Sequence, residues 1–192
     1  SGMPDLNYRN PAVTAEAERI AEFWLREMNV DGFRLDAIRH LIEDGDVMTD
    51  TPATRAWLRK FQARLRQIEP DVLTVGEVWA STEAVSDYIA EDALDLAFEF
   101  DLATAILDAA LTGTKAKLAY TLDNVAASYP ANRYATMITN HDQNRVASEL
   151  GEDTARLKLA AGLLLTAPGV PFVYYGEEIG QIGAKPDEMI RN

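Results

Sequence analysis

The sequence contains no cysteine and no apolar run as long as the roughly 18 residues that a membrane-spanning helix needs. Disulfide bridges and thiolate metal sites are therefore excluded, and cysteine usage gives no indication of the cellular location. The first residues also lack the basic-then-apolar order of a signal peptide. We interpret Ser1-Gly2 as a cloning remnant, so a native leader could have been removed.

Basic residues are scarce relative to acidic ones. The chain has 18 Lys and Arg against 31 Asp and Glu, which gives a formal net charge of −13. Such a field repels phosphate backbones and anionic lipid, so we expect neither nucleic acid nor a membrane surface as a partner. An uncharged sugar meets no such repulsion, and clustered carboxylates suit glycoside chemistry or a bound cation.

The length and composition are those of a soluble globular protein. The 192 residues are 47% hydrophobic and 26% charged, enough to bury one substantial core. We therefore expect a single domain over residues 1–192.

Helical and strand patterns alternate along the chain. Asn10-Pro11 and Thr51-Pro52 each place a capping side chain before a proline, which predicts two helix starts. Further helices are predicted after Ser81 and over 102–111 and 154–166, and a break at Thr112-Gly113-Thr114. Over 115–132 the helical pattern is interrupted, and Tyr129-Pro130 suggests a loop. Strands are predicted at 30–38, 72–75, 94–100, 134–139 and 170–175. The alternation predicts an α/β fold with a parallel sheet.

The first motif is Asp-Gly-Phe-Arg-Leu-Asp-Ala-Ile-Arg-His, residues 31–40, at the end of a predicted strand. Side chains alternate along a strand, so Arg34 and Asp36 share a face and the guanidinium would orient an ionised carboxylate. A glycosidic nucleophile requires such a carboxylate. Taken alone, however, the pattern fits an ordinary surface ion pair better.

The second motif, Gly76-Glu77-Val78-Trp79, follows the next predicted strand. Gly76 allows close backbone approach, and a carboxyl beside an aromatic ring can have its pKa raised by desolvation. Glu77 would then be a proton donor near neutral pH. The alternative is a solvated loop glutamate next to a core tryptophan.

The third motif, Thr-Asn-His-Asp-Gln-Asn-Arg at 139–145, is rich in groups that hydrogen-bond hydroxyls. Alone, it equally fits a polar turn or a helix N-cap at Asp142. The chain has only two histidines, His40 and His141, and both lie inside these motifs.

Together, the three acidic residues each follow a predicted parallel strand, at the edge where α/β barrels build active sites. Asp36 and Glu77 are 41 residues apart, and Glu77 and Asp142 are 65 apart. These separations fit one βα unit and then two, so we expect the three carboxyl groups to meet at one face.

In this order and context, the segments resemble the conserved regions of the α-amylase family of glycoside hydrolases. Met3–Asn7 and Gly169–Glu178 resemble further family segments, so the resemblance covers essentially the whole chain. It implies a partial TIM-type (β/α)8 barrel with about five parallel strands, the family's strands four to eight.

The resemblance implies roles for the matched positions. Asp36 would be the nucleophile, Glu77 the general acid/base and Asp142 the transition-state stabiliser. Substrate-binding or orienting residues would be Arg34, His40, Trp79 and His141. The reaction would be retaining hydrolysis of α-glucosidic bonds in starch-type α-glucans or maltooligosaccharides.

The sequence also departs from the family. The segments of the first three strands, with their Asp and His, and the small protruding domain are absent, along with most of the family's calcium ligands. We therefore expect no cofactor in this stretch, with calcium a property of the full-length parent. We expect the isolated chain to be inactive and to self-associate through exposed barrel edges.

Two alternatives belong to other classes. A magnesium-dependent enolase-type barrel would use the acids as ligands, but no lysine base lies in the strands before Asp36 or Glu77. Tight Mg²⁺ binding without saccharide binding would favour it. A non-catalytic barrel relative or carbohydrate-binding fragment would keep the residues without turnover.

Overall fold

The computed structural model describes residues 6–186, and these residues form two compact units. The first unit comprises the residues up to Trp79 together with Ala84–Ala97. The second comprises Ala80–Glu83 together with the residues from Phe98 onward. The single-domain organisation stays a prediction. Ser1-Gly2 and most of the Met3–Asn7 segment lie outside the described residues.

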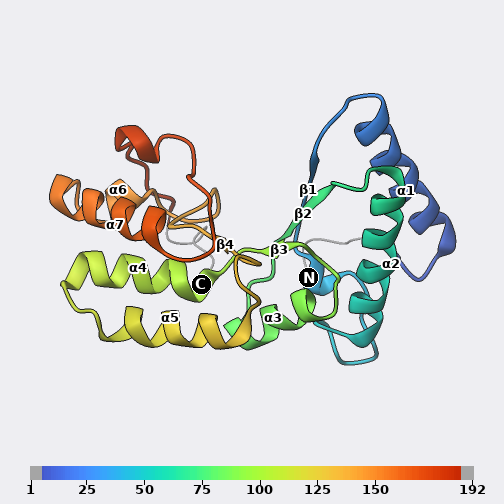
Figure 1. Ribbon diagram of the computed structural model, residues 1–192, viewed down its shortest axis with the longest axis horizontal. Helices are drawn as coiled ribbons and strands as arrows, with labels where there is room; N and C mark the ends of the chain where they lie inside the picture. The colour runs from blue at the N-terminus through green and yellow to red at the C-terminus, as the bar shows by residue number, and fades with distance from the viewer. Residues whose placement is uncertain (1–5, 187–192) are drawn as a thin grey trace. The chain divides into compact units, whose positions relative to one another are not determined.

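Two long helices of the first unit, α1 (Pro11–Arg26) and α2 (Pro52–Ile68), lie side by side (Figure 1). The side chain of Asn10 accepts a hydrogen bond from the Ala12 amide at 3.0 Å. That of Thr51 accepts one from the Thr54 amide at 3.1 Å. Both predicted helix starts are therefore confirmed, and the mechanism is the predicted capping of an otherwise unpaired amide.

A three-stranded parallel sheet lies beside these helices in the order β1-β2-β3. Its strands are β1 (Gly32–Leu35), β2 (Leu73–Gly76) and β3 (Leu96–Ala97), and α3 (Thr82–Ala90) connects β2 to β3. The prediction of a strand over 30–38 is wrong at its end. Ala37 has a left-handed φ of 45°, and Ile38–His40 is the 3₁₀ helix η1. The turn ends pairing at Leu35 and places Asp36 just beyond the strand.

The apolar core of the first unit joins both helices to the sheet. Its buried members are Ala21, Leu25, Phe61, Leu65 and Val72. Phe33, Leu35, Trp57 and others pack against this cluster. The helical spacing of the apolar residues thus buries one face of each helix, as the sequence pattern predicts.

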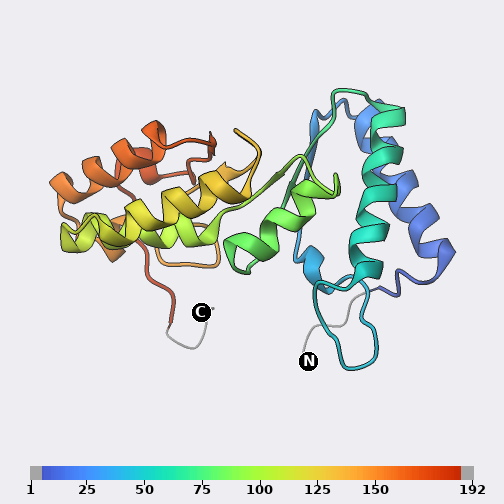
Figure 2. The same ribbon diagram turned by 60° about the horizontal axis from the view of Figure 1, so that its bottom comes forward.

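The second unit contains helices around two short parallel strands. Its elements are α4 (Phe100–Thr112), α5 (Ala116–Ser128), β4 (Ala135–Thr136), α6 (Val146–Glu149), α7 (Thr154–Thr166), β5 (Val170–Pro171) and η2 (Glu177–Ile179). Helix α4 contacts both α5 and α7 (Figure 2). The predicted helix over 154–166 is confirmed at both ends, and Asp153 caps it.

Four predictions for the chain from β3 onward need correction. The interruption of the helical pattern predicted within 115–132 is wrong up to Ser128, because α5 fills this stretch and buries Leu118, Thr121 and Val125 at helical spacing, whereas the loop at Tyr129-Pro130 is confirmed. The strand predicted over 94–100 is shorter than expected: β3 covers Leu96–Ala97, Phe98 adds one isolated parallel bridge to Ala135, and Phe100 already begins α4. The strands expected at 134–139 and 170–175 pair over two residues each. The predicted break after α4 is confirmed, with Gly113 at φ 74°.

Every ladder between these strands is parallel, and helices separate successive strands. The α/β class is therefore confirmed. None of the described helices is long and apolar enough to cross a membrane.

Candidate active site

The register of the first sheet brings two of the predicted acids together. Leu35 of β1 pairs with Gly76 of β2, so Asp36 and Glu77 leave neighbouring strands at the same level. The Glu77 amide donates to the Leu35 carbonyl at 2.9 Å, which continues the pairing by one bond. Gly76 is required here for space, because a Cβ would lie 2.4 Å from a methyl carbon of Leu94.

Arg34 links the two carboxyl groups. Its Nη1 lies 2.5 Å from Asp36 Oδ1, and its Nη2 lies 2.7 Å from Glu77 Oε2. The predicted Arg34–Asp36 pair is confirmed. The Arg34–Glu77 pair was not predicted, since it depends on the pairing of strands that are distant in the sequence.

The two carboxyl groups lie in different environments. The side chain of Asp36 is 72% exposed, whereas that of Glu77 is only 12% exposed. Burial raises the pKa of Glu77, and the nearby Asp36 carboxyl raises it further, although Arg34 and the Ala37 amide act in the opposite direction. The predicted direction is confirmed, and the alternative of a solvated loop glutamate is wrong.

Arg39 supports the loop that carries Glu77, a contribution that sequence reasoning missed. Its guanidinium donates to the Trp79 carbonyl and to the Asp50 carboxylate. Asp50 also accepts a hydrogen bond from the Tyr88 hydroxyl at 2.7 Å. These partners come from separate segments, so no spacing in the sequence indicates the network.

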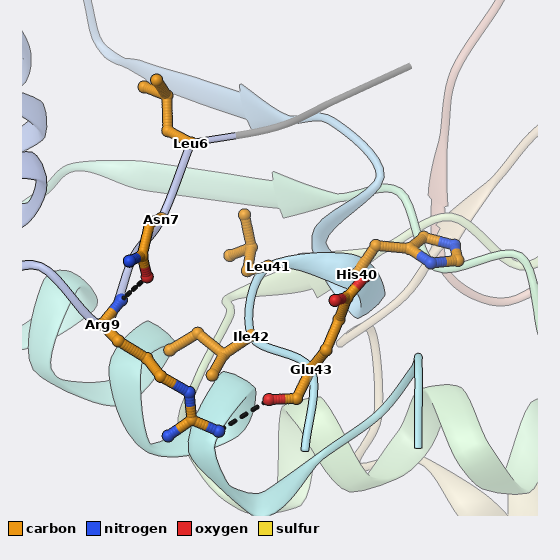
Figure 3. A pocket seen from close by; sticks show the side chains of 7 residues that line it. All are labelled: Leu6, Asn7, Arg9, His40, Leu41, Ile42 and Glu43. Atoms are coloured by element: carbon orange, nitrogen blue, oxygen red, sulfur yellow. Dashed lines mark hydrogen bonds between the residues drawn. The ribbon is translucent and has the colours of Figure 1, made fainter. Parts of the chain in front are cut away.

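His40 lines a different pocket of the first unit, with a volume of about 210 Å³ (Figure 3). At the opposite side of this pocket, Arg9 donates to the Glu43 carbonyl at 2.6 Å, and the His40 imidazole points away from Arg9. Within residues 6–186, no hydrogen bond joins His40 to Asp36 or Glu77. The structure therefore places His40 on the turn after β1 but not in the Arg34 cluster.

In the second unit, His141 and Asp142 form a separate cluster. His141 Nε2 lies 3.5 Å from Asp142 Oδ2, and Lys185 Nζ lies 3.8 Å from Asp142 Oδ1. The Asp142 amide donates to the Asn140 side chain at 2.9 Å within a turn. Asp142 is not an N-cap, because α6 begins only at Val146. Lys185 lies 43 residues further along the chain and was not predicted.

The turn with Asp142 is attached to the segment after β5. Thr139 donates to the carboxyl group of Glu177 at 2.7 Å, and burial raises the pKa of Glu177. The Arg145 guanidinium lies over the rings of Tyr174 and Tyr175, at 4.1 and 4.3 Å from their centroids. The two segments that resemble family motifs in this part of the chain therefore contact each other.

No group of three or more His, Cys, Asp or Glu side chains among the described residues could hold a metal ion. Asp36 and Glu77 belong to the first unit and Asp142 to the second. A common cavity for all three stays a prediction, as does a carboxyl separation of about 5–5.5 Å between Asp36 and Glu77, the distance of retaining enzymes.

Comparison with known proteins defines the class. Residues 1–192 match the family model of the alpha amylase catalytic domain. The chain therefore belongs to the alpha-amylase family of glycoside hydrolases. This membership favours glycoside chemistry over the enolase-type alternative.

Individual relatives agree. The chain is 38% identical to alpha-amylase 3 of Dictyoglomus thermophilum over its whole length, and 30% identical to a maltogenic alpha-amylase of Bacillus acidopullulyticus over 96% of it. It spans only 37% and 30% of these relatives.

Solved structures confirm the fold. All of the chain superposes on 39% of the alpha-amylase from H. orenii, with a TM-score of 0.83 and 38% identity. The same holds for 42% of the alpha-amylase from Geobacillus thermoleovorans, complexed with acarbose, with a TM-score of 0.82 and 27% identity. The structure is therefore part of an alpha-amylase barrel, as predicted.

Proposed function

We propose that the chain is part of the catalytic barrel of a retaining hydrolase that acts on starch-type α-glucans or maltooligosaccharides. The observation that carries this proposal is the pair of carboxyl groups joined by Arg34, one exposed and one shielded. Two carboxyl groups in different environments are what acid and nucleophile roles require. Membership of the family supports the choice of substrate.

Glu77 acts first as the general acid. Its raised pKa extends the pH range in which the carboxyl keeps its proton, which it donates to the leaving glycosidic oxygen. Asp36 attacks the anomeric carbon as the glycosidic bond breaks, and a covalent glycosyl-enzyme forms. Glu77, now ionised, takes a proton from water, whose oxygen attacks the same carbon and releases Asp36.

The remaining predicted residues bind or orient. Arg34 holds the carboxyl groups of Asp36 and Glu77 in position through its two terminal guanidinium nitrogens. Asp142 and His141 hold sugar hydroxyls during ring distortion, and Trp79 and His40 contact the substrate.

For the chain by itself, we propose self-association and little turnover. β1 and β5 each end the described order of their sheets, and Val173, just after β5, is 50% exposed. Unpaired strand edges with apolar side chains favour pairing with another copy. Light scattering that finds a monodisperse monomer would contradict the proposed self-association. Turnover of maltoheptaose by the 192-residue chain would contradict the proposed lack of activity.

The test of the chemistry uses the full-length parent protein with maltoheptaose. We expect Glu77→Gln and Asp36→Asn each to lower kcat by about 10²–10⁴-fold, the usual contribution of such groups. A substrate with a good leaving group, such as a maltosyl fluoride, needs no acid, so it should restore bond cleavage to Glu77→Gln but not to Asp36→Asn. Asp87→Asn, an exposed acid on α3, is the matched control. Full activity of either active-site variant, or inversion of the product anomer by NMR, would refute the proposal.

A further inference from the structure

A second pocket, with a volume of about 300 Å³, lies within the second unit between the start of α3 and the helices α4 and α5. Its volume is at the lower end of the range for small-molecule sites. None of the residues assigned above to catalysis or substrate binding lines it. The pocket therefore needs its own explanation.

Tyr120 of α5 contributes an aromatic surface to this pocket and is 73% exposed. Its ring has no aromatic, ionic or hydrogen-bond partner within the described part of the chain. An exposed aromatic face gains free energy when an apolar surface covers it, and its polar hydroxyl can stay in water. The C–H face of a pyranose ring is such a surface.

The neighbouring Thr121 supplies a polar group without a partner. Its side chain lines the pocket and is only 7% exposed, yet its hydroxyl makes no hydrogen bond with any of residues 6–186. Other helical threonines satisfy their hydroxyls on the carbonyl four residues earlier, as in Thr104 and Thr112 at 3.0 and 2.8 Å. The hydroxyl oxygen is not among the buried side-chain atoms that lack a partner, so it is open to solvent in the pocket, where a ligand hydroxyl can replace water.

The rim carries both signs of charge and further hydrogen-bonding groups. Asp101 Oδ2 accepts from the Thr82 amide and hydroxyl at 3.1 and 3.3 Å, and Lys117 makes no ion pair with the described residues. Asn124 donates through Nδ2 to Glu83, while its carbonyl oxygen is a further acceptor. Carboxylate and ammonium groups together do not select an ion of either sign. They suit an uncharged ligand with many hydroxyls.

We propose that this pocket binds one glucose unit of an α-glucan chain, with the sugar ring stacked on Tyr120 and a hydroxyl paired with Thr121. The site is non-catalytic and separate from the residues proposed for hydrolysis. The choice of an α-glucan rests on the proposed function, whereas the recognition of a neutral sugar rests on the pocket.

The experiment measures maltoheptaose binding to the 192-residue chain by NMR titration of backbone amides. We expect shifts at residues 117–124 and, for Tyr120→Ala, binding about five- to tenfold weaker at that site, the loss that an aromatic contact accounts for. Tyr120→Phe keeps the ring and should bind within about twofold of the parent chain. Leu165→Ala, which removes a 61% exposed apolar side chain from α7, is the control and should change nothing.

Unchanged affinity in Tyr120→Ala, no saturable binding by the parent chain, or shifts that avoid residues 117–124 would each overturn the inference. Equal binding of β-linked cellohexaose would overturn the choice of an α-glucan. These outcomes are independent of hydrolysis. The proposed function is refuted if Glu77→Gln stays active, whereas the proposed sugar site is refuted if Tyr120→Ala binds maltoheptaose with unchanged affinity.

Discussion

Two partly buried carboxyl groups at opposite ends of the first unit's sheet have contrasting surroundings. Asp95 stands just before β3 and is 18% exposed. It accepts hydrogen bonds from Arg66 at 2.7 Å, Gln62 at 2.8 Å and the Thr74 amide at 2.9 Å. Glu77, just after β2, is 12% exposed and, among residues 6–186, accepts from Arg34 and the Ala37 amide.

The difference in donors reverses the effect on ionisation. Burial acts to raise the pKa of both groups, but for Asp95 the hydrogen bonds outweigh it and the pKa is lowered. For Glu77 burial prevails, with help from Asp36, and the pKa is raised. The number of donors, not burial alone, decides whether a buried carboxyl is anionic. In barrels of this kind the amino ends of strands serve stability and the carboxyl ends serve chemistry, and the role proposed for Glu77 follows that division.

The largest difference between Asp95 and Glu77 is expected when each carboxylate is removed by substitution. Asp95→Ala leaves the buried Gln62 amide and the Thr74 backbone N–H without this acceptor, whereas the partly exposed Arg66 keeps Asp92 at 3.6 Å. We therefore expect it to lower the free energy of unfolding by about 2–4 kcal/mol. Glu77→Gln should change it by at most about 1 kcal/mol, since the charge that it removes is poorly stabilised. Urea unfolding followed by circular dichroism measures both, with Asp87→Ala as the surface control, within about 0.5 kcal/mol. Equal losses of unfolding free energy at positions 95 and 77 would contradict the proposed difference between the two carboxyl groups.

Close packing behind Glu77 can be tested at a glycine. Gly76→Ala would place a methyl group against Leu94 and Ile38, and we expect a loss of about 1–3 kcal/mol in unfolding free energy. Gly162→Ala in α7 is the matched control, because nothing lies within 4 Å of the added carbon. There the substitution should stabilise the chain by about 0.5–1 kcal/mol. The same sign at both positions would contradict the packing argument.

The electrostatic origin of the Glu77 shift can be separated by substitution of its neighbours. Asp36→Asn removes a group that raises the Glu77 pKa, so we expect that pKa to fall. Arg34→Met removes a group that lowers it, so the pKa should rise. Carbon-13 NMR titration of the Glu77 carboxyl reads both changes. No shift in either variant would show that burial alone sets the pKa, and shifts in the same direction would contradict the assigned charge effects.

The smallest expected effect is on the pH dependence of stability. Because the native pKa of Glu77 lies above its ordinary 4.5, the native state retains a proton that the unfolded chain has lost. Its contribution is therefore present below pH 4.5 and is lost as the pH rises through the native pKa. For Asp95 the sign is opposite: its contribution is present above pH 3.8 and is lost as the pH falls through its lowered native pKa.

Unfolding free energies measured from pH 3 to 8 should therefore fall less steeply above pH 4.5 in Glu77→Gln than in the parent chain. Glu99 and Glu177 also have raised pKa values through burial, so only the difference between the two curves isolates Glu77. Parallel curves would contradict the assignment.

The sequence predicted local features well. Helix starts at Asn10 and Thr51 depend on neighbouring residues, and both were confirmed. Strand lengths were overestimated, because pairing depends on partners distant in the chain and the sequence shows only the apolar pattern. Helix α5 was missed because its buried residues are few and a Tyr-Pro pair close to its end suggested a loop.

The candidate site was predicted only where its contacts are local in the sequence. Arg34 and Asp36 are two residues apart, so strand alternation was sufficient to pair them. The contacts from Arg34 to Glu77, Arg39 to Trp79 and Lys185 to Asp142 each join segments about 40 residues apart. Only strand register and loop conformation create these contacts, and neither can be deduced from residue spacing.

The forked guanidinium of Arg34 has a consequence for the charge of the site during turnover. With Glu77 protonated and Asp36 ionised, the three side chains sum to zero. Under the proposed roles, Glu77 becomes an anion as Asp36 becomes a neutral ester, so the sum is still zero. The negative charge passes from one arm of a rigid fork to the other, while the cation between them stays in place. Under the proposed mechanism, a covalent bond therefore forms and breaks at this site without a change in the net charge that its surroundings must solvate.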